Sequence, residues 1–270
     1  RLAKELGERK IIELILKSVD RMPDMPLPFG EDASAVDFGT GDLAVINTDM
    51  LVRETDVPPK MTLWQAARKA VIMNISDLAA KGCVPLVLLI SLGLPPNMKK
   101  MQLKQIGKGL NAGAREYDAY LVGGDTNQTS DLIINGTALG FCSKKNLIKR
   151  SGAKPGDYVA VTGPFGKTAS GLKILMRNLP IPSSFELLVD SVLMPKAKVK
   201  EGVALGQSQT ATASIDSSDG LAWSLFELSR SSNVGFYLEN LPIAPQVKKF
   251  AKTYRLKSDE LALYCGEEYE

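Results

Sequence analysis

Tyr-Asp-Ala-Tyr-Leu-Val-Gly-Gly-Asp-Thr-Asn, residues 117–127, is the stretch around which we interpret the fold. It predicts a short buried strand over 119–122 that stops at two glycines and then presents Asp125 and Thr126. Glycines at a strand end let the backbone turn sharply, so the carboxylate that follows is held in a defined direction. Such a carboxylate is a candidate metal ligand, although an aspartate after two glycines is also ordinary turn chemistry. The metal interpretation gains weight because the pattern recurs.

Acids follow other predicted strands and one loop. A strand over 43–47 ends in Thr48 and Asp49, and a strand over 210–215 runs into Asp216 and Asp219. A proline-rich loop after the first predicted helix, residues 2–19, delivers Asp32, followed by small residues that would let another group approach. These repeats suggest several acids in similar settings.

A helix is predicted over 63–81, with Thr62 as its N-cap and Gly82 as its stop. At about 100 degrees per residue, Asn74 falls within its apolar face and Asp77 on the edge of that face. Burying polar groups there is costly unless something pairs with them. A metal would satisfy Asp77, and an aspartate reaching solvent at the margin of the stripe is the alternative.

The order of predicted elements indicates mixed α/β layers in two domains. Composition shifts to Lys, Ser, Gly and Pro around 144–157, so we place the boundary between an N-terminal domain, 1–145, and a C-terminal domain, 146–270. The remaining predicted strands cover 86–92, 132–141, 158–162 and 235–238, and the remaining predicted helices cover 97–117, 168–178, 196–205, 221–230 and 245–254.

Composition excludes several classes of protein. The 270 residues contain no histidine, which excludes histidine triads and imidazole metal sites and leaves oxygen ligands for a hard cation such as Mg²⁺. The three cysteines have no paired spacing, so we expect neither a disulfide framework nor a zinc site. The net charge of +3 comes from well-mixed charges and does not favour nucleic acid. With no apolar run near the length of a membrane span and no signal peptide before the first helix, we expect no membrane partner and a cytoplasmic location.

One motif competes with the acids for the phosphate-binding role. Residues 161–168, Val-Thr-Gly-Pro-Phe-Gly-Lys-Thr, lie between a predicted strand and a predicted helix. A P-loop needs glycine where Val161 stands, so the match fails at the turn-forming position. A weaker role, in which backbone N–H groups at the helix start contact an anion, stays open.

Clustered carboxylates repel one another and raise each other's pKa unless a divalent cation neutralises them. Mg²⁺ held by a few carboxylates, waters and substrate phosphates is the usual arrangement for phosphoryl transfer. If the acids converge, they therefore predict a magnesium-dependent site. The acids concerned are Asp32, Asp49, Asp77, Asp125, Asp216 and Asp219.

The chain as a whole resembles the thiamine-monophosphate kinases. The same ATP-binding plan occurs in a broader superfamily with aminoimidazole ribonucleotide synthetase, selenophosphate synthetase and a hydrogenase maturation factor. The matching motifs, in family order, are Gly-Glu-Asp-Ala at 30–33, Thr-Asp-Met-Leu-Val at 48–52, Asn-Ile-Ser-Asp-Leu-Ala-Ala-Lys-Gly at 74–82, Gly-Gly-Asp-Thr at 123–126, Ser-Gly-Ala-Lys-Pro-Gly-Asp at 151–157, Asp-Ser-Ser-Asp-Gly-Leu at 216–221 and Gly-Glu-Glu-Tyr-Glu at 266–270.

The resemblance implies a reaction and a fold. The γ-phosphoryl group of ATP would pass to thiamine monophosphate to give thiamine diphosphate. The acceptor oxygen belongs to an ionised phosphate, so no general base and no catalytic side chain of that kind is expected. The implied fold is a two-domain α+β arrangement of the aminoimidazole ribonucleotide synthetase type, in which the N-terminal sheets of two subunits meet in a homodimer.

The resemblance also assigns roles to residues. Several Mg²⁺ ions would be held by Asp32, Asp49, Asp77, Asp125, Asp216 and Asp219, with Asn47 and Thr48 close to a metal. ATP would contact Gly124, Asp125, Arg150 and Ser218, with Arg150 as a fork onto phosphate oxygens. The thiamine moiety would face Asp56 and Glu267.

Three features depart from the family pattern, and two other functions compete. Asp56 stands where many members have histidine, Glu268 stands where aspartate is common, and we expect the family sequence, including a substrate-covering aromatic, to continue past Glu270. The alternatives are another ATP-using synthetase of the superfamily and a protein that binds MgATP without turnover. Selenophosphate synthesis is disfavoured because the N-terminal loop has no cysteine.

Overall fold

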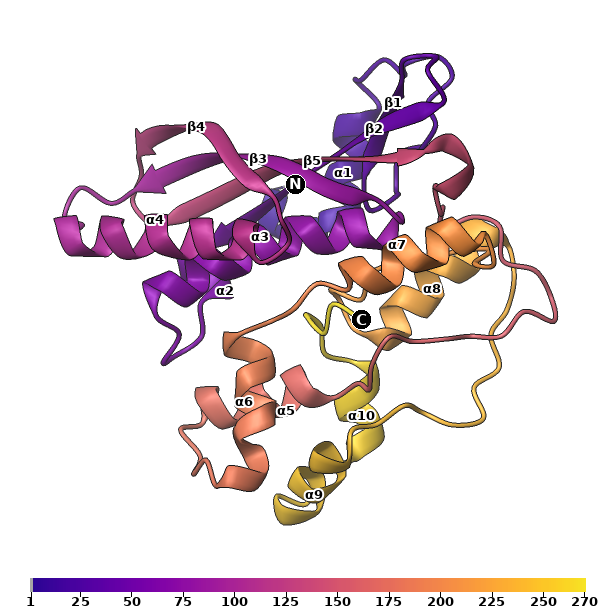
Figure 1. Cartoon of the computed structure of the whole chain (residues 1–270). Coiled ribbons are helices and arrows are strands. Elements are labelled where there is room, and N and C mark those ends of the chain that lie inside the picture. The colour runs from indigo at the N-terminus through magenta and orange to yellow at the C-terminus, as the bar shows by residue number, and fades with distance from the viewer. Residues whose placement is uncertain (1) are drawn as a thin grey trace.

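A five-stranded mixed sheet forms the upper layer of the molecule in Figure 1. The computed structural model describes residues 2–270. The strand order is β1-β2-β5-β3-β4; β3 and β4 are parallel, and the other neighbours are antiparallel. The strands are β1 (Ser34–Asp37), β2 (Asp42–Val52), β3 (Val84–Leu94), β4 (Tyr120–Gln128) and β5 (Ile133–Ser143).

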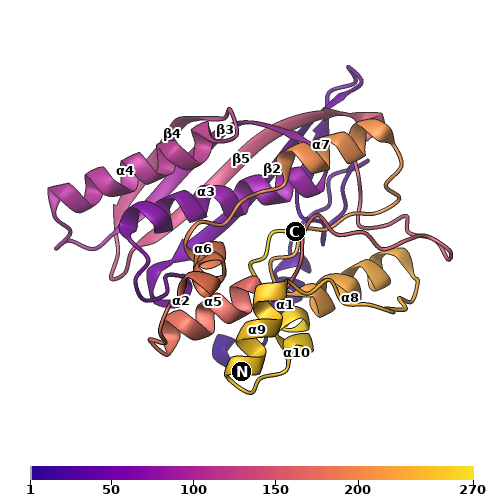
Figure 2. The same ribbon diagram turned by 60° about the horizontal axis from the view of Figure 1, so that its bottom comes forward.

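Two long helices, α3 (Leu63–Ala80) and α4 (Lys100–Arg115), cover one face of this sheet (Figures 1 and 2). The predicted N-cap of α3 is confirmed: Thr62 Oγ1 accepts a hydrogen bond from Gln65 N at 3.2 Å, and Gln65 Oε1 accepts one from Thr62 N at 2.9 Å. Alternate residues of β2, such as Val45, point towards α3 into the apolar core.

The prediction that a buried strand stops at Gly123 and Gly124 is wrong. β4 continues through both glycines to Gln128, at the edge of the sheet, and most of its residues are exposed. Between Leu88 and Leu89 the pairing of β3 with β4 shifts, so Val122 is an extra residue in a bulge. A Cβ on Gly124 would overlap the carbonyl oxygen of Ile90, which explains why a glycine pairs so closely with β3.

Thr48 and Asp49 also lie within a strand rather than at its end. β2 is 11 residues long and pairs with β5 along its whole length. Successive side chains of a strand point to opposite faces, so Asp49 faces α3 and Thr48 faces away.

Helices make up the second half of the chain and, together with Met61 and Ala66 of the first half, enclose a second apolar core below the sheet layer. In this core the rings of Phe185 and Phe250 meet edge to face at 5.4 Å between centroids. α7 packs directly on α3, so the two halves share an interface. The helices are α5 (Lys167–Met176), α6 (Glu186–Leu193), α7 (Val199–Ser208), α8 (Leu221–Ser232), α9 (Pro245–Thr253) and α10 (Ser258–Leu263).

The predicted strands over 158–162, 210–215 and 235–238 are not strands in the structure. Across residues 146–270 the only β-type pairing is an isolated bridge between Phe165 and Ile243. Strands need partners, and residue 158, a tyrosine, is 100% exposed with no neighbouring strand beside it. The last strand of the sheet ends at Ser143, and the division into two domains at 145/146 stays a prediction.

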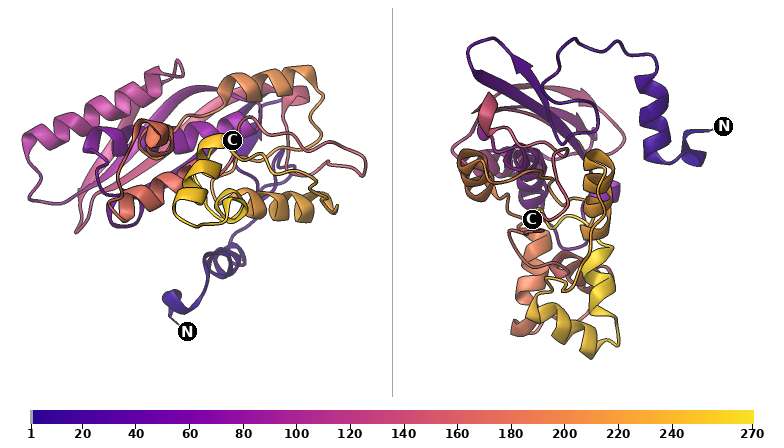
Figure 3. Two further views of the ribbon diagram at one scale, coloured as in Figure 1. Left: turned by 90° about the horizontal axis from the view of Figure 1, so that it is seen from below. Right: turned by 90° about the vertical axis from the view of Figure 1, so that its right-hand side faces the viewer.

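The N-terminal helix α1 (Glu8–Leu16) stands off from the body (Figure 3, right), and α2 (Arg53–Asp56) is a short helix after β2. α1 reaches α8 through Arg9, whose guanidinium lies 4.0 Å from the Trp223 ring centroid and pairs with Glu227.

The C-terminal residue lies between the sheet layer and the lower helices (Figures 1 and 3). No helix in residues 2–270 has the length and apolar character needed to cross a membrane.

Candidate metal and phosphate site

Three acids from separate parts of the chain meet beneath the sheet. Each of Asp32, Asp77 and Asp216 offers a carboxylate oxygen, and these oxygens all lie within 4.8 Å of one another. Asp32 comes from the loop before β1, Asp77 from the last turns of α3, and Asp216 from the loop before α8. The structure therefore brings together three of the six acids that the sequence singles out, and we call them the acid triad.

Amide side chains on β2 and α3 hold the polar residues of α3 in position. Asn47 Nδ2 on β2 donates to Asp77 Oδ2 at 2.8 Å and to Asn74 Oδ1 at 3.2 Å. Asn74 is fully buried, and its Nδ2 donates back to the Ala70 carbonyl at 2.9 Å. A Cβ on Gly136 of β5 would overlap the Asn74 amide, so a glycine at this position makes room for the network. These bonds fix Asp77 in place.

Two cations contact the Asp32 end of the triad. The Lys81 ammonium lies 2.8 Å from Asp32 Oδ2 and 2.8 Å from Glu31 Oε2, with its side chain fully buried. The Arg150 guanidinium pairs with Asp32 and donates to the Gly30 carbonyl at 2.8 Å. At the other end, Ser76 Oγ donates to Asp216 Oδ2 at 3.1 Å. Positive charge is therefore concentrated on Asp32 and is sparse around Asp77 and Asp216.

The pKa shifts follow this distribution. Burial, then repulsion from Asp216 and Asp32, raises the pKa of Asp77 well above its ordinary value. Burial, then repulsion from Asp32, raises the pKa of Asp216 to about 8. Burial also acts to raise the pKa of Asp32, but Lys81 and Arg150 outweigh it and hold that pKa below its ordinary value. Two of the three triad carboxylates therefore lack the positive charge that would stabilise their ionised form.

The donor set suits a hard divalent cation. Besides the triad carboxylates, Asn47 presents a buried Oδ1 that has no hydrogen-bond partner in the described structure. Mg²⁺ prefers oxygen ligands and usually binds one or two carboxylates together with water and phosphate. A cation at the triad would supply the missing positive charge and a partner for the orphaned amide oxygen, so the residues fit Mg²⁺.

A cavity of about 660 Å³ opens beside the triad, and we call it the Arg150 cavity. Its walls come from α1, the loop before β1 and α8. The predicted ATP contacts Arg150 and Ser218 both line it, together with Asp216 and Asp219. In this structure Arg150 is engaged by Asp32 and Gly30 rather than directed freely at the cavity.

A second cavity, of about 510 Å³, contains the two predicted thiamine-facing residues, Asp56 and Glu267, and we call it the Glu267 cavity. Ser218 and Asp219 line this cavity as well as the Arg150 cavity, so the loop before α8 lies between the two. Asp49 is influenced by Asp219, Asp56 and Glu267, but burial is the main cause that raises its pKa to about 6. Asp49 is therefore close enough to Asp219, Asp56 and Glu267 to interact with them electrostatically, while Asp219 itself lines both cavities.

Thr48, Gly124 and Asp125 do not join the triad within this chain. The register puts Asp125 in one row with Ser91, Asn135 and Met50, one residue away from the row of Asp49. This row faces away from α3, on the uncovered side of the sheet, and Thr48 points to the same side. The structure thus divides the predicted ligands between the two faces of the sheet.

The P-loop-like residues 161–168 contact an anion from the chain itself. Thr168 N, at the start of α5, donates to Glu268 Oε1 at 3.2 Å, and Lys167 Nζ pairs with Glu270 Oε1 at 2.9 Å. One backbone N–H at the helix start and the Lys167 ammonium are therefore already engaged by carboxylates of the 266–270 segment.

Sequence reasoning missed Lys69 of α3, Lys81 at the C-terminal cap of this helix, and the role of Glu31. Lys81 contacts Glu31 and Asp32, and Lys69 pairs with Glu267 at 2.8 Å. A signal was available for Lys81, because it lies four residues after Asp77 and therefore on the same helix face. Nothing in the local sequence indicates the partner of Lys69, which is almost 200 residues away.

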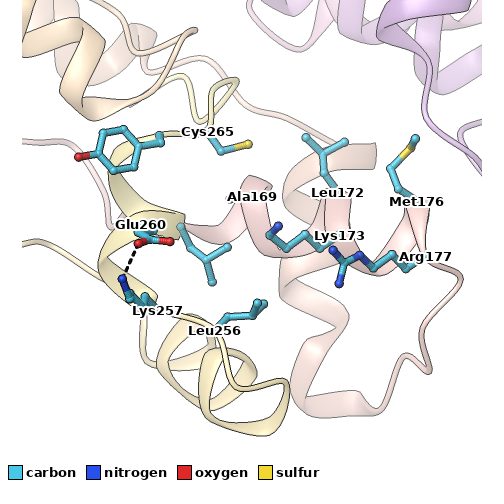
Figure 4. Close-up of a pocket in the computed structure, with 11 residues that line it drawn as sticks. Ala169, Leu172, Lys173, Met176, Arg177, Leu256, Lys257, Glu260 and Cys265 are labelled. Carbon is cyan, nitrogen blue, oxygen red and sulfur yellow. Dashed lines mark hydrogen bonds and ion pairs between the residues drawn. The ribbon is translucent and has the colours of Figure 1, made fainter.

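A third cavity, of about 470 Å³, contains none of the predicted site residues (Figure 4). It lies between α5 and the chain around α10. Lys173 comes from α5 and Arg177 follows its last residue, and the Lys257–Glu260 ion pair stands across from them (Figure 4). Leu172 and Met176 line both this cavity and the Glu267 cavity, so the two are neighbours.

Comparison with known proteins shows one consistent likeness. Residues 30–142 match the family model for the AIR synthase related protein, N-terminal domain. The thiamine-monophosphate kinase of Pyrococcus horikoshii is 38% identical over 268 residues, 98% of this chain and 81% of that protein. The Pyrococcus abyssi thiamine-monophosphate kinase is 40% identical over 269 residues, with the same two coverages of 98% and 81%.

Solved structures show the same likeness to thiamine-monophosphate kinases. AaThiL complexed with AMPPCP and TMP has a TM-score of 0.90 at 28% identity, covering 100% of this chain and 84% of that chain. The thiamine monophosphate kinase from Aquifex aeolicus has a TM-score of 0.87 at 27% identity, covering 100% and 87%. The predicted α+β fold class of aminoimidazole ribonucleotide synthetase type is confirmed.

Proposed function

Because this chain belongs to the thiamine-monophosphate kinase family, we propose that it phosphorylates thiamine monophosphate with ATP by direct, Mg²⁺-assisted transfer. The AaThiL structure that is similar over the whole chain was solved with AMPPCP and TMP, which supports ATP and thiamine monophosphate as the two small-molecule substrates. The kinase activity follows from membership of this family. The bound metal, the roles of individual residues and the homodimer are our proposals.

The convergence of the acid triad is the observation that carries the metal proposal. Carboxylates from three distant segments, two of them with raised pKa, lie within 4.8 Å of one another. Asp32, Asp77 and Asp216 would hold Mg²⁺, with Asn47 close to it. The ion would neutralise charge between the two phosphate groups when bound.

The two cavities suggest a division of substrates. We propose that ATP occupies the Arg150 cavity, where Arg150 and Ser218 contact it, and that thiamine monophosphate occupies the Glu267 cavity. Ser218 and Asp219 line both, so the reacting phosphates would meet at this loop. The acceptor phosphate is already ionised, so the chain's own task is to position two anions in line rather than to remove a proton. Asp49 and Asp219 would contribute to metal binding on the acceptor side.

Gly124 lies in the row of Asp49, but Thr48 and Asp125 require a different explanation, because their side chains point to the uncovered sheet face. That face also carries Met50 and Leu89, which are 52% and 48% exposed. We propose that a second copy of the chain covers this face in a homodimer, in which the sheets of the two copies meet as the family resemblance implies. Asp125 and Thr48 would then act only in the dimer. Light scattering should then give a mass twice the 29.2 kDa of one chain. A fully active monomer would remove this part of the proposal.

The activity is tested by incubating the protein with ATP, Mg²⁺ and thiamine monophosphate and separating thiamine diphosphate by chromatography. Asp77→Asn should abolish product formation, because the triad loses a carboxylate while the shape is kept. Asp37→Asn is the matched control: Asp37 pairs with Lys144 on the surface at 2.9 Å and should leave the rate unchanged. A second control omits Mg²⁺ in the presence of a chelator.

Other outcomes identify the alternatives. A superfamily synthetase would release ADP without any dependence on thiamine monophosphate, and a nucleotide sensor would bind ATP and release no ADP. Equal activity of Asp77→Asn and the native chain would contradict the assignment of the triad. The cytoplasmic location expected from the sequence stays a prediction.

A further inference from the structure

Lys69 is a buried cation of α3 that faces the Glu267 cavity from behind. Its side chain is 2% exposed, and its Nζ lies 2.8 Å from each carboxylate oxygen of Glu267. The same ammonium donates to the carbonyl oxygen of Asp56 at 3.0 Å. Lys69 thus joins the helix beneath the sheet to both segments that carry the predicted thiamine-facing side chains.

The Glu267 backbone needs such support. Its φ is +64°, in the left-handed region, and Tyr269 two residues later has a φ of +55°. A left-handed conformation is unfavourable for a residue other than glycine, so it persists only where surrounding contacts enforce it. One such contact is the hydrogen bond from Glu267 N to the Ser218 carbonyl at 2.6 Å. Within residues 2–270, Lys69 is the cation paired with the Glu267 carboxylate.

The cavity itself is acidic. Glu54, Asp56, Asp219 and Glu267 line it, and no lysine or arginine of the described chain does. Lys69 lies behind this lining and takes up no space in the cavity. Carboxylates facing one another across a cavity repel, and a flexible glutamate would move away unless it is held. A cavity with held carboxylates is complementary to a cationic ring such as the thiazolium of thiamine.

We propose that Lys69 is a positioning residue for substrate specificity: it fixes the Glu267 carboxylate and the Asp56 segment so that the Glu267 cavity accepts the thiazolium cation of the phosphoryl acceptor. The proposal rests on the proposed function, because it takes thiamine monophosphate as the acceptor. It concerns binding of the acceptor and leaves the Arg150 cavity, where ATP would bind, unaffected.

The neighbouring residue provides a matched control. Arg68 is a buried cation on the same helix, 1% exposed, but it pairs with Glu116, the residue after α4, at 2.7 Å and donates to the Pro195 carbonyl at 2.8 Å. Replacing either residue by methionine removes one buried charge from α3. Only the Lys69 replacement frees Glu267, so general loss of stability and loss of positioning can be told apart.

Steady-state kinetics with each substrate varied in turn test the proposal. Lys69→Met should raise KM for thiamine monophosphate by about tenfold or more while KM for ATP changes less than about twofold, because binding of one substrate alone is weakened. Lys69→Arg should recover part of the loss. Arg68→Met should leave the ratio of the two KM values unchanged. Titration calorimetry with thiamine monophosphate should show the same order of affinities without turnover.

An equal rise of both KM values in Lys69→Met, or the same change in Arg68→Met, would overturn the proposal and leave Lys69 a structural residue. If Lys69→Met does not fold, Lys69→Gln, which also removes the charge, carries the test, and an unchanged KM ratio in that variant overturns it. If the native chain forms no thiamine diphosphate, the proposed function fails. Calorimetry then decides the role of Lys69 separately: equal affinity for thiamine monophosphate in native chain and Lys69→Met refutes it.

Discussion

Lys81→Met should be among the most destabilising single substitutions in the N-terminal half of the chain. The Lys81 ammonium is fully buried, lies 2.8 Å from carboxylate oxygens of both Glu31 and Asp32, and donates to the Ser214 carbonyl at 3.1 Å. Methionine keeps the length and the apolar stem but removes the charge and the donors. Asp32 would keep Arg150 as its one cation, and Glu31 would keep only the backbone N–H of Arg150, at 3.0 Å.

The magnitude follows from the burial. Removing one partner of a buried ion pair costs about 3–5 kcal/mol, because a desolvated charge is left without compensation. The total free energy of unfolding of a typical domain is about 5–15 kcal/mol, so the loss would be a large fraction of it. Adding Asp32→Asn to Lys81→Met should restore part of the stability, since the uncompensated charge is then reduced.

Urea denaturation followed by circular dichroism measures the change. Lys144→Met is the control, because Lys144 forms the same kind of pair with Asp37 at 2.9 Å but with 67% of its side chain exposed. That variant should unfold at the same urea concentration as the native chain. A loss below about 1 kcal/mol for Lys81→Met would refute the reasoning, since it would show that Glu31 and Asp32 find other partners or solvent.

Three further predictions address the site and its surroundings. Gly136→Ala should lower the free energy of unfolding by about 1–3 kcal/mol in urea denaturation, because the new Cβ overlaps the buried Asn74 amide; an unchanged midpoint would show that Asn74 can move aside. Burial raises the pKa of Asp216 to about 8 and that of Asp49 to about 6, so without Mg²⁺ the native state binds more protons than the unfolded chain, and Tm should fall as pH rises from about 4 to about 8. A saturating Mg²⁺ concentration should reduce this slope, and a slope that Mg²⁺ leaves unchanged would argue against metal binding here. Gly266→Ala should raise KM for thiamine monophosphate more than KM for ATP, because a Cβ there overlaps a carbonyl of the loop before α8 and displaces the segment that carries Glu267; equal changes in both KM values would count against the division of substrates between two cavities.

Local sequence patterns were enough to predict the long helices and the acids of the triad, on the side of the sheet that α3 covers. The N-cap at Thr62 and the position of Asn74 and Asp77 on one face of α3 depend on helix geometry alone, which is regular. The structure confirms both and shows that the face is buried against β2. The carboxylates of the triad were likewise found by residue type and setting, although their distances could not be obtained from sequence.

The register of the strands could not be predicted from local sequence patterns. Side chains alternate along a strand, so an error of one residue in where a strand ends or bulges exchanges the two faces. Val122 is such an extra residue in β4, and β2 continues past Thr48 and Asp49. Both effects depend on pairing with distant strands. For this reason the sequence could not show that Asp125 and Thr48 face away from the triad.

The strands predicted in the second half failed for a related reason. Residues 158–162 have the apolar composition of a strand, yet Val159 and Val161 are 46% and 39% exposed and no described strand pairs with them. Composition indicates that a segment can form a strand, and only a partner in space makes it one.

The element that organises the chain is α3 rather than the strand at 117–127. Its side chains, together with that of Lys81 at its C-terminal cap, contact every segment that contributes an acid to the triad or to the Glu267 cavity, and three of these residues are buried cations whose partners lie far away in the sequence. A buried cation on a rigid helix defines where a distant loop must dock, because any other position leaves its charge unpaired. The site is therefore assembled by long-range charge pairing onto one helix, and substitutions of these cations should separate loops that local sequence alone cannot hold together. The contacts are Arg68 with Glu116, Lys69 with Glu267, Asn74 with Asn47, Ser76 with Asp216, Asp77 with Asn47, and Lys81 with Glu31 and Asp32.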